Sequence, residues 1–138
     1  MTNYELPKAV DLFTHQVTTA NNLWTVFVAA TFAAAGFGTS LGTDNLAGRV
    51  AITIGFWAFA LGHLRLLLQA LGILKSLGTA IASFVQTSFQ TTLGGHEFGL
   101  PLQRLASSTN RPRSAAAVHL VIDTCVTAAV WAPYLATH

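Results

Sequence analysis

The sequence predicts an all-α integral membrane protein with three transmembrane helices and an N-terminal amphipathic helix in the membrane interface. Hydrophobic residues make up 52% of the 138 residues and charged residues only 9%, whereas soluble domains contain roughly 25% charged residues. The apolar residues are gathered in three runs separated by polar stretches. Because about 20 apolar residues in a helix cross a bilayer, each run is a candidate span.

Residues 1–21 predict the interfacial helix. Leu6, Val10, Phe13 and Val17 recur at helical spacing, and the residues between them are largely polar. A helix with one apolar stripe, placed just before a span, is typical of a segment that lies in the membrane interface.

The membrane domain is expected over residues 22–138. Its first span, residues 23–41, contains no charged residue and reaches about 28 Å at the helical rise, enough for the hydrocarbon core. The second and third spans are predicted at residues 50–74 and 115–136. Residues 75–114 are expected to form a helical extension and a basic loop between them.

The basic residues favour three crossings over four. A fourth span over residues 77–93 would separate the N-terminus from the basic loop and expose several amides and hydroxyls to lipid. With three spans, five basic residues share one side and Arg49 stands alone on the other: Lys8, Lys75, Arg104, Arg111 and Arg113. The positive-inside rule then predicts a cytoplasmic N-terminus and a C-terminus on the opposite side of a bacterial inner membrane or an organellar membrane.

Small residues predict helix packing on two of the spans. Ala29, Ala33 and Gly36 lie on one face of the first span, and Gly55 and Gly62 lie on one face of the second. In lipid such faces let helices approach closely, so that dispersion forces can hold them together. The expected partners are therefore membrane lipids and other membrane subunits or copies of the same chain.

Polar side chains inside two spans predict a shared intramembrane layer. The second span contains His63, Arg65 and Gln69, and the third contains His119 and Asp123. Ionisable groups at membrane depth are costly and usually face a partner inside the bundle. Counting along the helices from each span's end places the two sets at one depth, so we expect Arg65 or His63 to meet Asp123 or His119 across a close helix contact.

The function predicted from these features is that of a small non-catalytic membrane subunit in a larger complex or a homo-oligomer. Two alternatives stay open: a proton or ion channel or transporter unit, and an electron-transfer anchor that binds haem or quinone through His63 and His119. No nucleophile–base pair or metal-ligand cluster stands out, so neither catalytic nor metal-binding residues are expected. Seven basic residues are too few for a nucleic-acid surface.

The third span also carries a short resemblance. His119-Leu120-Val121-Ile122-Asp123 is similar to part of the Arg-His-Leu-x-x-Asp motif of the small membrane-anchor subunits of succinate dehydrogenase, and Val118 stands at the position of the motif's arginine. The chain also resembles those subunits in length, in its three spans and in its intramembrane histidines. The resemblance implies an anchor in electron transfer, but it covers five residues and assigns no site.

Overall fold

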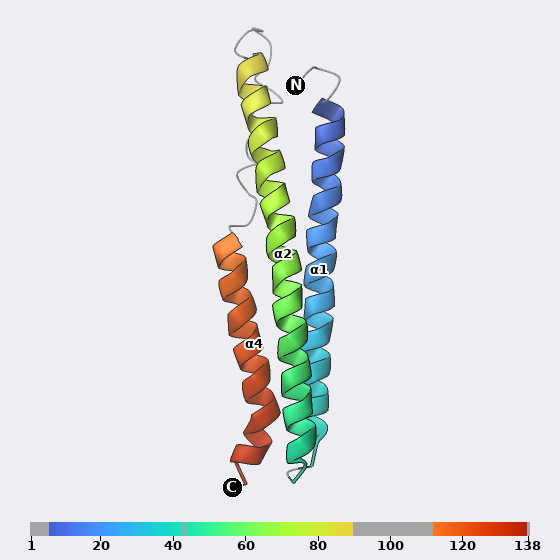
Figure 1. The fold of residues 1–138 in the computed structure, drawn as a ribbon, viewed down its shortest axis with the longest axis vertical. Helices are drawn as coiled ribbons and strands as arrows, with labels where there is room; N and C mark the ends of the chain where they lie inside the picture. Colours follow the sequence, from blue (N-terminus) through green and yellow to red (C-terminus); the bar gives the residue numbers. More distant parts are fainter. Residues whose placement is uncertain (1–5, 43, 90–111, 138) are drawn as a thin grey trace. The chain divides into compact units, whose positions relative to one another are not determined.

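The computed structural model describes residues 6–42, 44–89 and 112–137. In this part of the chain the structure is all-helical (Figure 1), with three α-helices in the order α1 (Leu6–Ser40), α2 (Leu46–Phe89) and α4 (Pro112–Leu135).

Each of the three helices contains a stretch that is long and apolar enough to cross a membrane. These stretches are Pro7–Ser40, Leu46–Phe84 and Pro112–Leu135. The all-α fold and the number of apolar helices therefore agree with the prediction of a helical membrane protein.

The predicted N-terminal interfacial helix is not a separate element, and this prediction is corrected. One helix continues from Leu6 to Ser40, and its apolar stretch begins at Pro7. The polar residues near its middle do not end the helix, and the hydroxyls of Thr18 and Thr19 donate hydrogen bonds to carbonyls one turn earlier, at distances of 3.2 and 3.1 Å.

The helical extension predicted after residue 75 belongs to α2, which continues to Phe89. The basic loop predicted around Arg104 and Arg111 lies outside the described residues.

The chain divides into two units. The first combines Met1–Asn21 with Gln69–Pro112, and the second combines Asn22–Leu68 with Arg113–His138. In the first unit the described buried residues are mainly apolar: Ala9, Phe13, Ala20, Ala70, Leu71, Leu74 and Ile81. Its exposed side chains are largely polar, among them Lys8, Asp11, Thr14, His15, Lys75, Ser76 and Thr79.

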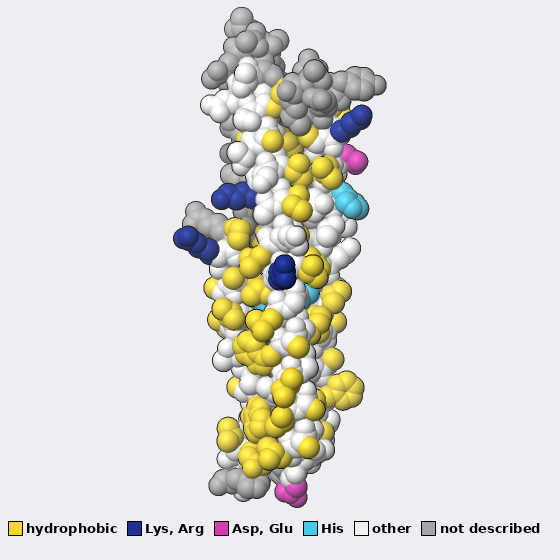
Figure 2. Space-filling model, in the orientation of Figure 1, with side chains coloured by type: hydrophobic (Ala, Val, Ile, Leu, Met, Phe, Trp, Pro, Cys, Tyr) yellow, Lys and Arg dark blue, Asp and Glu magenta, His cyan; other side chains and the backbone are white. Residues whose placement is uncertain are grey.

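The second unit has the opposite distribution. Its three helical segments lie side by side, with α2 antiparallel to α1 and α4 (Figure 1). Its interior contains charged and polar side chains as well as apolar ones: Phe27, Arg49, Phe56, His63, Leu67, His119, Asp123 and Val130. Large apolar side chains are exposed on its surface, including Phe32, Phe37, Ile54, Leu61 and Val121. Figure 2 shows a face of the molecule with many hydrophobic and few charged side chains.

A tight turn connects α1 and α2 within the second unit. Asn45 caps the start of α2, because its Oδ1 accepts a hydrogen bond of 2.9 Å from the backbone N–H of Gly48. A Cβ atom at Gly48 would lie 2.9 Å from that oxygen, so a side chain there would require the Asn45 amide to shift. The turn places Arg49, in the first turn of α2, beside the last carbonyls of α1.

Candidate functional site

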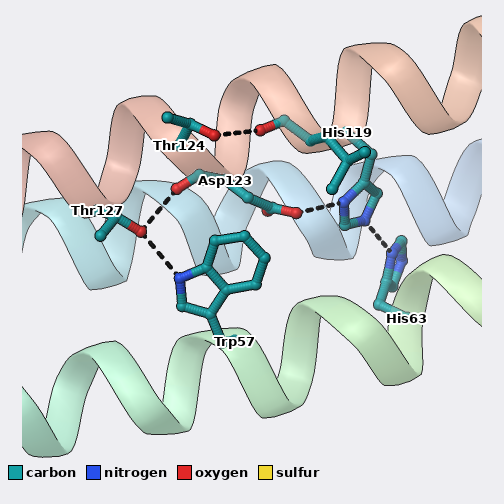
Figure 3. Close-up of polar contacts among 7 residues, drawn as sticks. Trp57, His63, His119, Asp123, Thr124 and Thr127 are labelled. Atoms are coloured by element: carbon teal, nitrogen blue, oxygen red, sulfur yellow. Dashed lines mark hydrogen bonds and ion pairs between the residues drawn. The ribbon is translucent and has the colours of Figure 1, made fainter.

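His63 connects the three helices of the second unit at one level. Its Nε2 lies 2.8 Å from the backbone oxygen of Leu23 in α1, and its Nδ1 lies 3.3 Å from Nε2 of His119 in α4. The contact between the two imidazoles is drawn in Figure 3. His63 is buried, so one side chain of α2 ties α1 and α4 together away from solvent.

Asp123 completes this chain of contacts on α4. Its Oδ2 lies 2.8 Å from Nδ1 of His119, one helical turn away, and the two side chains are 2% and 0% exposed. The other carboxyl oxygen, Oδ1, is buried and has no hydrogen-bond partner among the described residues. His63, His119 and Asp123 thus form the three-residue cluster that we call the histidine–aspartate layer.

The hydrogen-bond acceptors restrict where the protons of this layer can lie. The Leu23 carbonyl can only accept, so His63 carries its proton on Nε2 and, in its neutral form, accepts at Nδ1. With His63 in that neutral form, His119 donates from Nε2. A single proton remains to be shared between His119 Nδ1 and Asp123 Oδ2, and on either atom it leaves the layer without net charge. This neutrality reduces the cost of burying the layer.

Aromatic rings enclose the two histidines. The ring of Phe27 stacks on His119 with a centroid distance of 3.8 Å and lies 5.3 Å from the ring of His63. Trp24 contacts Phe27 edge to face at 5.9 Å. Phe27 itself is 0% exposed, so the imidazoles pack against an apolar wall of α1, and their polar edges are left for each other, Leu23 and Asp123.

Two tryptophan–threonine contacts join α2 and α4 in a reciprocal way. Trp57 of α2 donates from Nε1 to the hydroxyl of Thr127 in α4, and Trp131 of α4 donates to the hydroxyl of Thr53 in α2, each at 3.0 Å. Each threonine donates in turn to the carbonyl one turn earlier in its own helix. Every polar hydrogen in the pair is therefore used, as a helix contact in lipid requires.

Arg49 forms a second connection among the three helices. Its guanidinium donates to the carbonyl of Gly38 in the last turn of α1 at 3.2 Å, to those of Leu41 and Gly42 just after α1 at 3.1 and 3.4 Å, and to the carbonyl of Val130 in α4. The side chain is 0% exposed. The last carbonyls of a helix have no partner within the helix and carry partial negative charge, so a cation suits this position.

The closest helix approach beside Arg49 involves Gly38. A methyl group added at Gly38 would overlap the side chain of Val130 on α4. By contrast, a Cβ atom at Gly36, Gly55 or Gly62 would meet no heavy atom within 4 Å. The glycines singled out by their spacing therefore make no close contact among the described residues, and Gly38 is the one that admits α4.

The other predicted packing residues and the remaining polar residues also point outward. Ala29 and Ala33 are exposed on α1. Arg65 and Gln69 are exposed on α2. In the contact expected across the two spans, His63 rather than Arg65 meets His119, and Asp123 is connected to His63 through His119.

Sequence reasoning missed Arg49 and the tryptophan–threonine pair. Arg49 stands at the start of a span, where an arginine is expected to reach the headgroups, and nothing local shows that the end of α1 lies beside it. The pair does leave a signal. Thr53 and Trp57 have the same four-residue spacing as Thr127 and Trp131, and this repeat in two antiparallel spans could have predicted their contact.

Comparisons with protein-family models, with curated proteins and with solved structures find no match to the chain. The described residues also contain no group of three or more histidine, cysteine or acidic side chains that could hold a metal ion. The fold and the histidine–aspartate layer therefore indicate only a broad class of protein. It is a membrane protein with three apolar helices and a hydrogen-bonded polar cluster between them.

Proposed function

We propose that the chain is a small non-catalytic membrane subunit that packs against other transmembrane helices, in a larger complex or in an oligomer of its own. The observation that carries this proposal is the exposure of two small-residue faces. On α1 the face contains Ala29, Ala33 and Gly36, and on α2 it contains Ala51, Gly55, Ala58 and Gly62.

These faces are open to a neighbouring helix. No heavy atom lies within 4 Å of a Cβ built at Gly36, Gly55 or Gly62. Large side chains stand beside the α1 face, where Phe32 is 76% and Phe37 is 68% exposed. Small residues allow backbones to approach closely, and in lipid this packing rather than hydrophobicity drives helix association.

The histidine–aspartate layer supports a structural role better than proton transfer. Its hydrogen bonds end at the carbonyl of Leu23, and a backbone carbonyl has no proton to pass on. Within the described residues the layer thus ties three helices together and supplies no exit at α1. In the proposed subunit it fixes the register of the helices that present the packing faces.

The geometry also gives little support to a haem anchor. Both ring nitrogens of His63 and both of His119 already face a hydrogen-bond partner. A haem iron would have to displace one of these partners before either histidine could bind it as an axial ligand. The five-residue resemblance to succinate dehydrogenase anchors stays without further support.

Leucine substitutions on the open α2 face test the subunit role. Gly55→Leu and Gly62→Leu should abolish cross-linking to neighbouring chains in native membranes, because each blocks close helix approach. Their own fold should persist, since a Cβ atom at either position meets no heavy atom of a neighbouring element within 4 Å. Leu61→Phe is the matched control, because Leu61 is exposed on the adjacent lipid-facing surface.

Mass spectrometry of the cross-linked products then identifies the partner as a second copy or a different chain. If both glycine variants cross-link as the parent chain does, or if the parent forms no cross-linked species, the proposed packing role is contradicted.

A further inference from the structure

We propose that Arg65 and Arg113 bind the phosphate groups of anionic lipids at one boundary of the hydrocarbon layer. The two residues lie on different helices of the second unit, and both are exposed. Among the described residues, no hydrogen bond or ion pair is formed by either guanidinium.

The contacts of His63 place both arginines on the same side of the histidine–aspartate layer. Arg65 lies two residues after His63 on α2, about 3 Å further along the helix. Arg113 lies six residues before His119 on α4, about 9 Å along that helix. Because α2 and α4 are antiparallel, both displacements have the same direction, and two long side chains can reach one layer of headgroups.

Within the second unit, the exposed large apolar side chains of α1 begin at the same level. Leu23 is joined to His63, and the exposed residue just before it is Asn22. On the other side of this level, the exposed large side chains of the unit are apolar, and they include Val26, Val28, Phe32, Phe37, Val50, Ile54, Leu61, Leu120 and Val121. On the arginine side, exposed large apolar side chains of the unit continue only to Leu66 and Val118, within about 5 Å of the level.

The thickness of the apolar surface fits a bilayer. The opposite boundary is marked by the turn that contains the exposed residues Asp44 and Asn45. Arg65 follows Asn45 by 20 residues on α2, which is about 30 Å at the helical rise and equals the usual thickness of the hydrocarbon core. Arg65 therefore stands at a boundary, where its apolar stem can lie along lipid and its charged end can reach the headgroups.

The chemistry favours a lipid phosphate over a carboxylate on a partner helix. A guanidinium presents a planar set of donors that matches phosphate oxygens, and anionic membrane surfaces attract basic residues. A neighbouring helix would cover one face of the bundle. A headgroup layer, in contrast, surrounds the whole bundle, so it can contact Arg65 on α2 and Arg113 on α4 at the same time.

Lipid binding to the purified full-length chain tests this proposal. Native mass spectrometry would count the bound molecules of dioleoylphosphatidylglycerol and of dioleoylphosphatidylcholine in detergent. We expect the anionic lipid to bind more tightly, and Arg65→Gln and Arg113→Gln each to weaken it roughly fivefold, with no effect on the zwitterionic lipid. Lys75→Gln, which removes an exposed cation of the first unit, is the control and should change little.

Unchanged phosphatidylglycerol affinity in the double glutamine variant would overturn the proposal. So would displacement of the lipid by inorganic phosphate alone. A third contradicting result is the loss of a co-purifying protein from the glutamine variants while their lipid binding persists. The last result would assign the arginines to a protein carboxylate. If the glutamine variants fail to fold, as judged by circular dichroism, the lysine variants at both positions decide, and they should keep the preference for anionic lipid at reduced affinity.

Discussion

The two units of the chain distribute polar and apolar side chains in opposite ways. In the first unit the described interior is mainly apolar, and the exposed side chains are largely polar. In the second unit Arg49, His63, His119 and Asp123 are buried, and large apolar side chains are exposed. Water favours the first distribution, whereas lipid favours the second, because a polar group in hydrocarbon must find its partner within the protein.

From this contrast we propose that the hydrocarbon layer surrounds the second unit. A span needs about 20 residues, but the apolar stretches of α1 and α2 contain 34 and 39 residues. Only part of each stretch can therefore lie in hydrocarbon. At each end of the second unit, one residue contacts all three helices: His63 at one end and Arg49 at the other. These two sets of contacts fix the register of the helices along the length of the unit.

The largest expected effect is the loss of the buried cation. Arg49→Met should lower the free energy of unfolding by about 3 kcal/mol or more, because it leaves four carbonyl acceptors without their donor. Unfolding in mixed micelles with increasing sodium dodecyl sulfate would measure it. Arg65→Met, at an exposed position of the same helix, is the control, and an equal loss in both variants would refute the role given to Arg49.

A second, smaller effect is expected from overpacking between α1 and α4. Gly38→Ala should cost about 1 to 3 kcal/mol, because the added methyl group overlaps Val130. Gly36→Ala, two residues away, meets no atom within 4 Å and should be neutral or slightly stabilising. Thermal denaturation of both variants compares them directly. The reverse order of stability would mean that Gly38 is not the point of close approach.

The histidine–aspartate layer is expected to contribute about 1 to 2 kcal/mol through coupled hydrogen bonds. Asp123→Leu should remove this stability. His119→Leu should then lower the free energy of unfolding by less in the Asp123→Leu variant than in the parent chain. Asp123→Asn should lower the free energy of unfolding by less than about 1 kcal/mol, because the amide can donate to Nδ1 of His119 and so preserve the contact between His119 and His63.

Double-mutant cycles on unfolding free energies separate these cases. Coupling between Asp123 and Arg65 should be absent, since Arg65 is exposed and makes no contact with the layer. A large loss in Asp123→Asn would instead show that the carboxyl's charge or titrating proton matters, and it would favour the proton-transfer alternative.

The smallest effects are expected at the tryptophan–threonine pair. Thr53→Val and Thr127→Val keep the shape of the side chain and remove one interhelical acceptor each. Each should cost about 0.6 kcal/mol, the average for hydrogen bonds between helices in a membrane protein. The two losses should add, because the pairs share no side chain. Exposed Thr124→Val serves as the control for the loss of a hydroxyl.

The sequence predicts the helices and much of the polar layer for clear physical reasons. Apolar run length identifies the spans, and counting along two antiparallel helices places His63 and His119 at one depth. It does not identify which face of α2 turns inward. His63 and Arg65 are only two residues apart, yet they point to opposite environments, because burial of His63 depends on Leu23 and Phe27 of α1.

The other differences also depend on contacts between helices. Small-residue spacing is equally good at Gly36 and Gly38, and the side chain of Val130 on α4 decides which glycine is close-packed. The separate N-terminal helix was expected because residues 6–17 have an amphipathic pattern, but no residue near Asn21 ends α1.

The most direct test of the central contrast uses thiol labelling in lipid nanodiscs, which leave both faces of the bilayer open to water. Cys125 is exposed on α4 of the second unit, and Ser76→Cys in a Cys125→Ala background places a thiol on the polar surface of the first unit. We expect a charged maleimide to label Cys125 at least about tenfold more slowly than the thiol at position 76, because the reagent does not enter hydrocarbon. Equal rates in the nanodisc would contradict the assignment of the second unit to the membrane interior.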